Sequence, residues 1–258
     1  GVFSDPEMVW TVAERLKDKE EILRAKAFPY QLLSAYRMAD ATVPMEVRAA
    51  LQAAMEVAIR NVPEIEGKVY VLPDVSGSMA SPVTGHRKGA ATAVRCIDVA
   101  ALVAAAILRK NPSAEVLPFE TCVVPVRLNP LDSVMTNADK LAAIGGGGTN
   151  CSAPLKVLNG RKERGDLVIL VSDNQSWVDA RRNGSTLMHE WSMFRERNPQ
   201  ARMVCMDLQP GATTQAMDRA DILNVGGFSD SVFEVVAEFS RGRFQEEHWV
   251  KSIEEIKL

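Results

Sequence analysis

The chain has few features of secreted, membrane-spanning or strongly charged proteins. Its longest strongly apolar stretch, CIDVAALVAAAIL at residues 96–108, is too short to cross a bilayer and contains Asp98, so it predicts a buried helix. A net charge of −3 gives no global positive field that would attract nucleic acid or an anionic membrane. No positively charged leader with an apolar core opens the sequence, so it gives no indication of secretion.

Cysteine is also scarce, and the cysteines do not pair in sequence. None of the four belongs to a Cys-x-x-Cys motif, which argues against a zinc ribbon and a disulfide framework. They are Cys96, Cys122, Cys151 and Cys205. Free thiols are typical of a reducing compartment, so we expect a cytoplasmic protein. The hydrophobic content of 47% and charged content of 24% are ordinary for a globular domain.

The first third of the sequence predicts helices. Ser4 with Glu7 has the spacing of a capping box, and apolar residues then recur at helical intervals. We expect a second helix over Tyr30 to Met38 and a third from near Pro44 to about Asn61. The proline and glycine in VPEIEG, residues 62–67, predict a boundary after these helices.

After Gly67, short β-branched runs alternate with helical stretches. The predicted strands are 68–72, 114–119, 166–172, 201–206 and 222–226. The predicted helices lie near 88–110, 137–144, 152–161, 186–197 and 230–240, with a last one at about 244–256. This alternation is typical of an α/β fold, a doubly wound and mostly parallel sheet. Residues 121–128 follow the second strand too closely for a crossover helix and, with Pro125, suggest an antiparallel edge hairpin.

Three segments with oxygen-bearing side chains should meet at the carboxyl edge of this sheet. Asp74, Ser76 and Ser78 leave the first strand, Thr149 follows the glycine run 145–148, and Asp173 ends the most apolar strand. Such ligands select a hard cation, Mg²⁺ first, with Mn²⁺ or Ca²⁺ as alternatives. Two carboxylates are a sparse anionic supply, so the metal would keep an open position that attracts a carboxylate or phosphate.

This five-part pattern resembles the metal-ion-dependent adhesion site of a von Willebrand factor A domain. The resemblance implies that Ser76, Ser78 and Thr149 bind the metal directly or through water. It also implies that Asp74 and Asp173 act mostly through waters or orient the hydroxyls. The departure is Pro73, which lacks the N–H donor expected of a strand residue directly before the motif.

A narrower resemblance covers nearly the whole chain. FPYQLLSAYR (28–37), DVSGSM (74–79), GGGGTNCSAPL (145–155) and VILVSDNQSW (168–177) occur in this order. Together they resemble the TROVE, or Ro autoantigen, proteins, in which HEAT-like helical repeats form an RNA-binding ring closed by a von Willebrand A domain. By that resemblance, residues 1–64 would be the end of the ring and 67–258 the A domain, with most of the ring absent.

The resemblance implies a noncatalytic function in RNA metabolism. The full ring would bind small noncoding, Y-like RNA and take part in RNA quality control beside an exoribonuclease. The A domain would be a Mg²⁺-dependent docking site for an acidic protein ligand or a phosphate, with no role for a membrane. A von Willebrand A adaptor of the kind that serves AAA+ machines, without RNA, is the alternative. The helical stretch containing FPYQLLSAYR favours the Ro-type interpretation.

A catalytic interpretation is weaker, and we expect no enzyme. A serine nucleophile needs an adjacent base, and His86, His189 and His248 fall in no motif with Ser76 or Ser78. RNA contact by the first helices is a further hypothesis. Its basic residues are Arg15, Lys17, Lys19, Arg24, Lys26 and Arg37, and its aromatic residues are Phe28, Tyr30 and Tyr36. Interspersed acidic residues favour a solvated helix face with buried aromatics instead, so we expect weak RNA binding by this chain.

Overall fold

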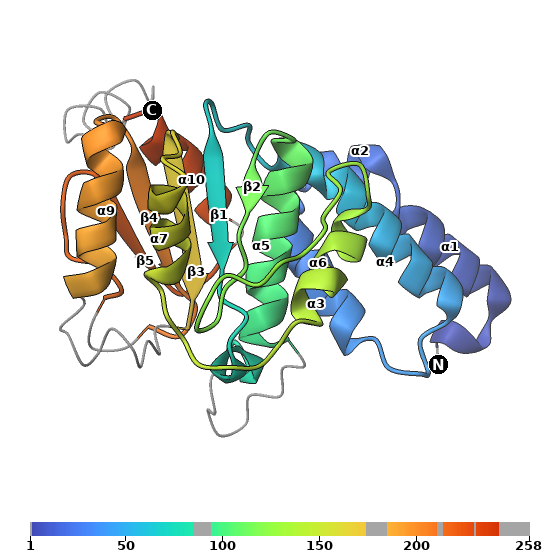
Figure 1. Ribbon diagram of the computed structural model, residues 1–258. Helices are drawn as coiled ribbons and strands as arrows, with labels where there is room; N and C mark the ends of the chain where they lie inside the picture. Colours follow the sequence, from blue (N-terminus) through green and yellow to red (C-terminus); the bar gives the residue numbers. More distant parts are fainter. Residues whose placement is uncertain (1, 85–93, 174–184, 211–213, 230, 243–258) are drawn as a thin grey trace.

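A computed structural model describes residues 2–84, 94–173, 185–210, 214–229 and 231–242 (Figure 1). The first of these ranges begins with four helices, and all later strands and helices belong to an α/β layer structure. None of the described helices combines the length and apolarity needed to cross a membrane. The last predicted helix, 244–256, lies outside the described residues.

The helical segment follows the sequence prediction with two corrections. The four helices are α1 (Pro6–Leu16), α2 (Lys19–Arg24), α3 (Pro29–Met38) and α4 (Met45–Ala58), with short 3₁₀ turns at Val2–Ser4 and Ile59–Asn61. Asp5, not Ser4, caps α1, because the Asp5 carboxylate accepts the Glu7 N–H at 3.0 Å. Asp18 starts a separate short helix, since its carboxylate accepts the Glu21 N–H at 2.8 Å.

The predicted doubly wound α/β sheet is confirmed. Five strands pair in the order β2-β1-β3-β4-β5, and every pairing is parallel. They are β1 (Val69–Pro73), β2 (Glu115–Val116), β3 (Leu167–Ser172), β4 (Arg202–Asp207) and β5 (Ile222–Gly226). Strands β1 and β3 are buried along their whole length because helices cover both faces.

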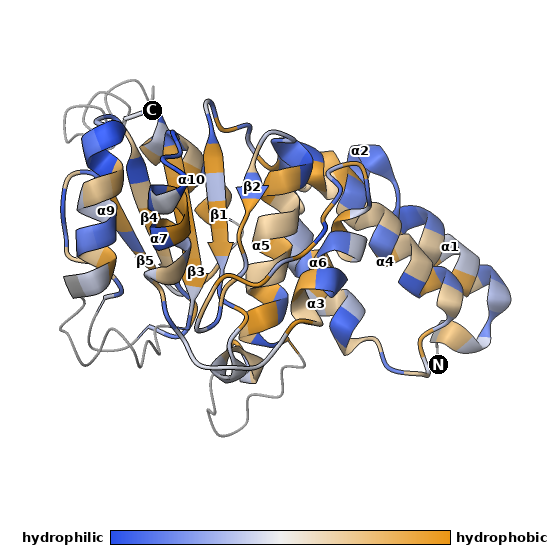
Figure 2. Cartoon of the chain, in the orientation of Figure 1, coloured by the Kyte–Doolittle hydropathy of each residue, from blue (hydrophilic) through white to orange (hydrophobic). Residues whose placement is uncertain are grey.

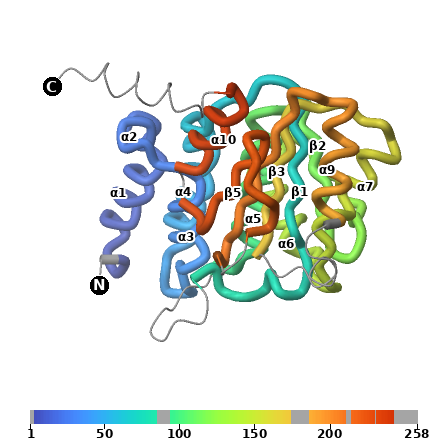
Figure 3. Tube along the Cα trace, turned by 90° about the vertical axis from the view of Figure 1, so that its left-hand side faces the viewer, coloured from blue at the N-terminus to red at the C-terminus, as the bar shows by residue number. Residues whose placement is uncertain are grey.

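Alternate side chains of the central strands belong to two separate hydrophobic cores, one on each face of the sheet. Val69 and Val71 share one buried cluster with α5 (Cys96–Lys110), α6 (Val134–Ala142), α10 (Val232–Ser240) and the helical segment. Tyr70 and Leu72 point to the other face, toward α7 (Ala153–Gly160) and α9 (Ser185–Arg197). Figure 2 shows the apolar colour concentrated on β1, β3 and α5, and Figure 3 shows α1–α4 and α9 on opposite sides of the sheet.

The predicted edge hairpin at 121–128 is wrong as a strand. This segment makes a single antiparallel bridge, between Phe119 and Val123, and then runs on without regular pairing. Backbone bonds Glu120 N–H to Cys122 O (2.9 Å) and Val124 N–H to Pro118 O (2.8 Å) make it a tight turn instead. Pro125 and the short length of the segment leave too few donors for a second strand.

Pro73 belongs to β1 and removes few hydrogen bonds from the sheet. Its carbonyl accepts the Phe119 N–H at 3.1 Å on the β2 side of the strand. The N–H that proline lacks would face that same side, where β2 ends at Val116. Pairing with β3 is undisturbed, because the Asp74 N–H donates to Val171 O at 2.9 Å. The departure in the motif therefore leaves the geometry at the strand end intact.

Candidate metal centre at the sheet edge

The register of β1 and β3 brings two of the predicted site segments together. Pro73 pairs with Val171, so Asp74 lies beside Ser172 and Asp173 follows at the same edge. Asp74 and Asp173 are both buried, with 0% and 2% of their surface exposed. Two buried acidic side chains at neighbouring strand ends are unusual, because burial penalises each charge unless a partner compensates it.

The predicted hydroxyls form one cluster. The Thr149 hydroxyl donates to Ser76 Oγ at 2.8 Å, although 73 positions separate the two residues. Ser76 Oγ lies 3.2 Å from Ser78 Oγ. A backbone bond from Gly77 N–H to Gly147 O, 3.1 Å long, ties the two loops together. Ser76 Oγ therefore lies within hydrogen-bonding distance of two other side-chain oxygens, one of them from a distant segment.

Asp74 is oriented by groups on both of its carboxylate oxygens. Oδ1 accepts the Ser76 N–H at 2.8 Å, and Oδ2 accepts the Ser172 hydroxyl at 2.6 Å. Ser172 was not singled out by the sequence analysis. Its only signal was its place directly before Asp173 at the end of an apolar strand, where a serine also occurs for no special reason.

Burial raises the pKa of Asp74 to about 6. Desolvation of the carboxylate is the largest cause, and hydrogen bonds from Ser172 and Ser76 offset it only in part. The neighbouring charge of Asp173 raises this pKa further. The same charge, after burial, helps to raise the pKa of the Cys96 thiol to about 11, which places Cys96 in the same electrostatic environment. A cation at this edge would relieve the unfavourable negative potential.

The glycine run before Thr149 is required at Gly147. That residue has φ +67°, and a Cβ there would overlap the Glu120 carboxyl group. The Asn150 N–H donates to Glu120 O at 2.8 Å, which seats the loop on the turn after β2. This hydrogen bond holds the residue next to Thr149 against the turn and so positions Thr149 near the strand ends. Of the neighbouring polar residues, Asn174 and Ser176 lie outside the described residues.

The donor set fits a hard divalent cation. Hydroxyl and carboxylate oxygens are the ligands that Mg²⁺, Mn²⁺ and Ca²⁺ take. The hydroxyl separations of 2.8 and 3.2 Å are ordinary hydrogen-bond distances and bring these oxygens close enough to share one ion. Within the described ranges, no group of three or more His, Cys, Asp or Glu side chains could hold a metal.

A nucleophilic interpretation of the same serines would need a base beside them. His189, the histidine within the described part of the chain, is exposed on α9. His86 and His248 lie outside the described residues. Ser76 Oγ lies within hydrogen-bonding distance of the hydroxyls of Ser78 and Thr149.

The predicted basic face of the first helices is largely neutralised. Lys17 pairs with Glu14 at 2.7 Å, and Arg24 pairs with Glu21 at 3.2 Å. Arg37 reaches Asp139 on α6 at 2.7 Å instead of facing solvent. This agrees with the favoured interpretation of a solvated helix face.

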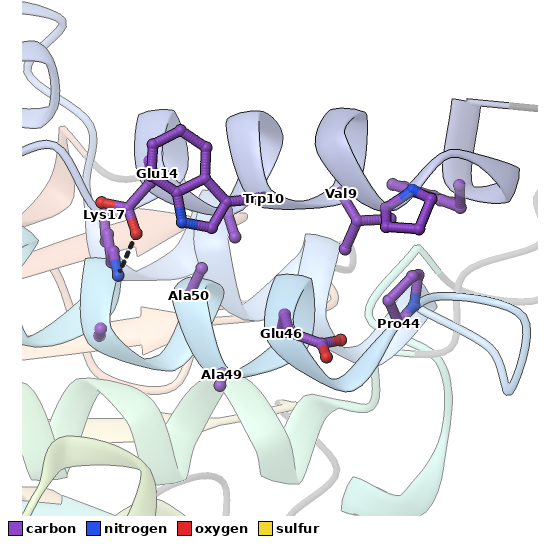
Figure 4. Close-up of a pocket in the computed structure, with 12 residues that line it drawn as sticks. Val9, Trp10, Glu14, Lys17, Pro44, Glu46, Ala49 and Ala50 are labelled. Atoms are coloured by element: carbon purple, nitrogen blue, oxygen red, sulfur yellow. Dashed lines mark ion pairs between the residues drawn. The ribbon is translucent and has the colours of Figure 1, made fainter.

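An apolar groove runs between α1 and α4 at the end of the molecule away from the sheet (Figure 4). Its volume is about 740 Å³. Trp10 lies along it with 64% of its surface exposed, and Val9, Pro44 and Ala50 line it. An exposed tryptophan beside a groove of small and apolar residues marks an interaction surface rather than a finished core.

Comparisons with known proteins found similarity over most of the chain. A family model described as the Ro60 vWA domain matches residues 68–240. The RNA-binding protein RO60 of Deinococcus radiodurans is 24% identical in an alignment 249 residues long, which covers 93% of this chain and 46% of that protein. The crystal structure of the D. radiodurans Ro (Rsr) protein superimposes with a TM-score of 0.75 at 23% identity, over 92% of this chain and 49% of that one. The chain thus spans about half the length of these relatives, and the structural likeness supports the fold.

Proposed function

Because the chain belongs to the Ro60 vWA domain family, we propose that it is part of a noncatalytic, Ro-type RNA-binding protein. The A domain would be its metal-dependent docking site, and RNA binding would belong to the helical ring of the longer protein. The partner at the ring would be a small noncoding, Y-like RNA, in the context of RNA quality control beside an exoribonuclease. The name of the Deinococcus relative, an RNA-binding protein, supports the RNA part of this proposal.

The observation that carries the docking site is the hydroxyl cluster above two buried carboxylates. Ser76, Ser78 and Thr149 would hold Mg²⁺, and Asp74 and Asp173 would supply the negative charge that retains it. When bound, the metal supplies a Lewis-acidic position for an anionic ligand. Ser172 and the Ser76 N–H hold Asp74 in place, so its charge is directed at the hydroxyls without a large rearrangement.

The ligand class follows from the charge balance. Two carboxylates neutralise a divalent cation only if both are ionised and close, and neutral hydroxyls add no charge. An open position in such a site retains attraction for a carboxylate or a phosphate. We therefore assign an acidic side chain of a partner protein, or a phosphate, as the group that docks here.

The groove between α1 and α4 supports a continuing helical ring. Trp10 and the small residues Ala49, Ala50 and Ala53 present a surface on which further helices of the same repeat type would pack (Figure 4). Small residues allow close helix approach, and the tryptophan would fill the space between neighbours. In this arrangement the residues now exposed at the groove become part of the ring's core.

Calorimetric titration with Mg²⁺ tests the docking site. Ser76→Ala and Thr149→Ala should each weaken Mg²⁺ binding by ~10-fold or more, since each removes one oxygen of a sparse donor set. Thermal unfolding without metal should change little. Ser192→Ala is the matched control, because its hydroxyl is exposed on α9 and donates to Met188 O at 2.9 Å. Unchanged magnesium affinity in both site variants would reject the assignment.

A further inference from the structure

A second pocket lies where the helical segment meets the end of β5 and the start of α10. Its volume is about 520 Å³, within the range of pockets that take small organic ligands. Lys26, Tyr30 and Gln31 line it from the helical segment, and Phe228 and Ser231 line it from the α/β layers. It is separate from the five candidate metal ligands, none of which lines it.

The pocket has an aromatic wall on a rigid base. The Tyr30 ring packs edge-on against Phe228, with centroids 4.9 Å apart and planes at 77°. The Phe233 ring packs edge-on against Phe228, with centroids 6.3 Å apart. It also stacks on the buried Phe28 ring at the same centroid distance. Tyr30 and Phe228 themselves remain half-buried. Each of these partly exposed rings is held in place by other aromatic side chains and offers a face on which a planar group can stack.

Lys26 brings a positive charge to the rim in an unfavourable backbone conformation. It ends α2 with φ +47°, while the Ala27 N–H donates to Ile22 O (3.1 Å) and the Lys26 N–H to Leu23 O (3.2 Å). This is the helix-ending geometry that glycine fills best, so a lysine there reduces stability. Among the described residues, no carboxylate forms an ion pair with Lys26.

The opposite rim offers hydroxyls and the start of a helix. Ser229 Oγ and Ser231 Oγ lie 2.6 Å apart, and both side chains are exposed. α10 begins directly after Ser231, whose side chain does not cap it. Glu234 in its first turn also lines the pocket and is suited to accept a hydrogen bond from a ligand hydroxyl or amino group rather than to meet a phosphate.

We propose that this pocket binds one nucleotide of a single-stranded RNA. The base would stack on the exposed face of Tyr30 and meet Phe228 at its edge, because the two rings are nearly perpendicular. The phosphate would meet Lys26, and the ribose hydroxyl would reach Ser229 or Ser231. The inference rests on the proposed RNA-binding function and gives this chain its own contact with the strand. A purely structural role explains the buried Phe28–Phe233 stack. It does not explain a lysine that has no ion-pair partner among the described residues, or exposed hydroxyls at the same opening.

Lys162 provides a matched control. It ends α7 with φ +54°, and the Lys162 N–H donates to Asn159 O (3.0 Å) and the Glu163 N–H to Leu158 O (2.9 Å). Its backbone geometry therefore repeats that of Lys26, while its side chain lines no part of the pocket. Substitution of either lysine by glycine removes the same charge and the same strain.

The experiment measures binding of fluorescein-labelled oligouridylate to the full chain at low salt, beside thermal unfolding. Lys26→Gly and Lys162→Gly should both raise Tm by ~2–4 °C. Only Lys26→Gly should weaken RNA binding, by ~3- to 10-fold, and lower the salt slope by about one. Tyr30→Leu should weaken binding by ~5-fold or more. Ultraviolet cross-linking of 4-thiouridine oligonucleotides should place adducts on the peptides that contain Tyr30 or Phe228.

Three outcomes would overturn the proposal. Equal affinity of Lys26→Gly and Lys162→Gly, with adducts elsewhere, would reject the pocket while leaving the RNA-binding function in place. Uridine monophosphate that binds as tightly as the oligonucleotide would identify a mononucleotide site instead. Absence of any oligonucleotide binding by the unaltered chain would remove both this site and an RNA contact by these residues.

Discussion

Hydrogen bonds from its neighbours hold the Asp74 carboxylate in one orientation, yet its negative charge remains unfavourable there. Its carboxylate is fully buried, and the hydrogen bonds from Ser76 and Ser172 only partly offset the loss of hydration, so its pKa is raised to about 6. Removal of either donor should make the ionised form still less favourable. The energetic role of Ser172 can therefore be separated from any role in metal binding.

Ser172→Ala should lower the free energy of unfolding by about 1–3 kcal/mol at pH 7, because it leaves a buried charged oxygen without its donor. It should also move the pKa of Asp74 above its present value of about 6. Urea unfolding in the absence of metal measures the first effect. Ser192→Ala, an exposed hydroxyl on α9, should stay within about 0.5 kcal/mol of the unaltered chain. Equal effects of the two substitutions would show that the Ser172 bond contributes nothing.

The candidate site could be predicted where chain topology alone decides proximity. Asp74 and Asp173 follow parallel strands, whose carboxyl ends must share an edge. Thr149 precedes α7, which leads back to the start of β3 and must therefore begin near that same edge. Ser172 could not be predicted, because a serine inside an apolar strand has no distinctive pattern. Its contact with Asp74 depends on the register of Pro73 with Val171, which spacing along the sequence does not give.

At the scale of elements, the start of α5 joins the helical segment to the α/β layers. Asp98, in the first turn of α5, accepts the Arg95 N–H at 2.9 Å and its guanidinium at 2.8 and 3.0 Å. Arg37 of α3 approaches the same carboxylate at 3.6 Å. Burial would raise the pKa of Asp98, but the hydrogen bonds and charges of Arg95, with the charge of Arg37, outweigh it and lower this pKa.

Because the pKa of Asp98 is lowered by folding, the free energy of unfolding should decrease as the solution becomes acidic. An acid whose pKa is lower in the folded state stabilises the fold at pH values above its pKa in the unfolded chain, which is about 3.8 for Asp98. The contribution is lost as the pH falls through the folded pKa. Asp98→Asn should remove about 1–3 kcal/mol at pH 7 and progressively less below pH 4, as measured by urea unfolding at several pH values.

Asp139→Asn is the control for this substitution. Asp139 pairs with the same Arg37 at 2.7 Å, but 54% of its side chain is exposed, so the change should be within about 0.5 kcal/mol. If Asp98→Asn lost the same stability at pH 3 as at pH 7, packing rather than charge would explain its effect.

Most strands and helices could be predicted because their apolar periodicity matches their burial. The errors occurred where a side-chain cap or a backbone turn decides the outcome. The helix predicted after Ser4 is divided because the Asp18 carboxylate caps a new turn, and hydrophobic spacing continues across the break. Residues 121–128 have strand composition, yet the turn that begins at Glu120 directs them away from the sheet edge.

For the whole molecule, the question is whether the helical segment and the sheet are one cooperative unit. The boundary predicted at residues 62–67 would divide them. However, Phe28, Leu33, Met55 and Ile59 belong to the same buried cluster as α5 and β1. The Glu56 carboxylate on α4 also accepts the Val134 N–H at the start of α6, at 2.6 Å. A shared core of this kind predicts that α4 unfolds with the sheet.

Helix α1 should behave differently. It buries Val9 and Ala13 against α4 and exposes Trp10, so it adds little apolar contact to the common core. Native-state hydrogen exchange in increasing urea should show the amides of α4 and β3 opening with the same free energy. The amides of α1 should open at least ~2 kcal/mol more easily. In a longer polypeptide whose added helices cover the groove beside Trp10, protection of α1 should rise toward that of α4. Exchange of α4 at a distinctly lower free energy than β3 would instead establish two separate folding units, divided at residues 62–67.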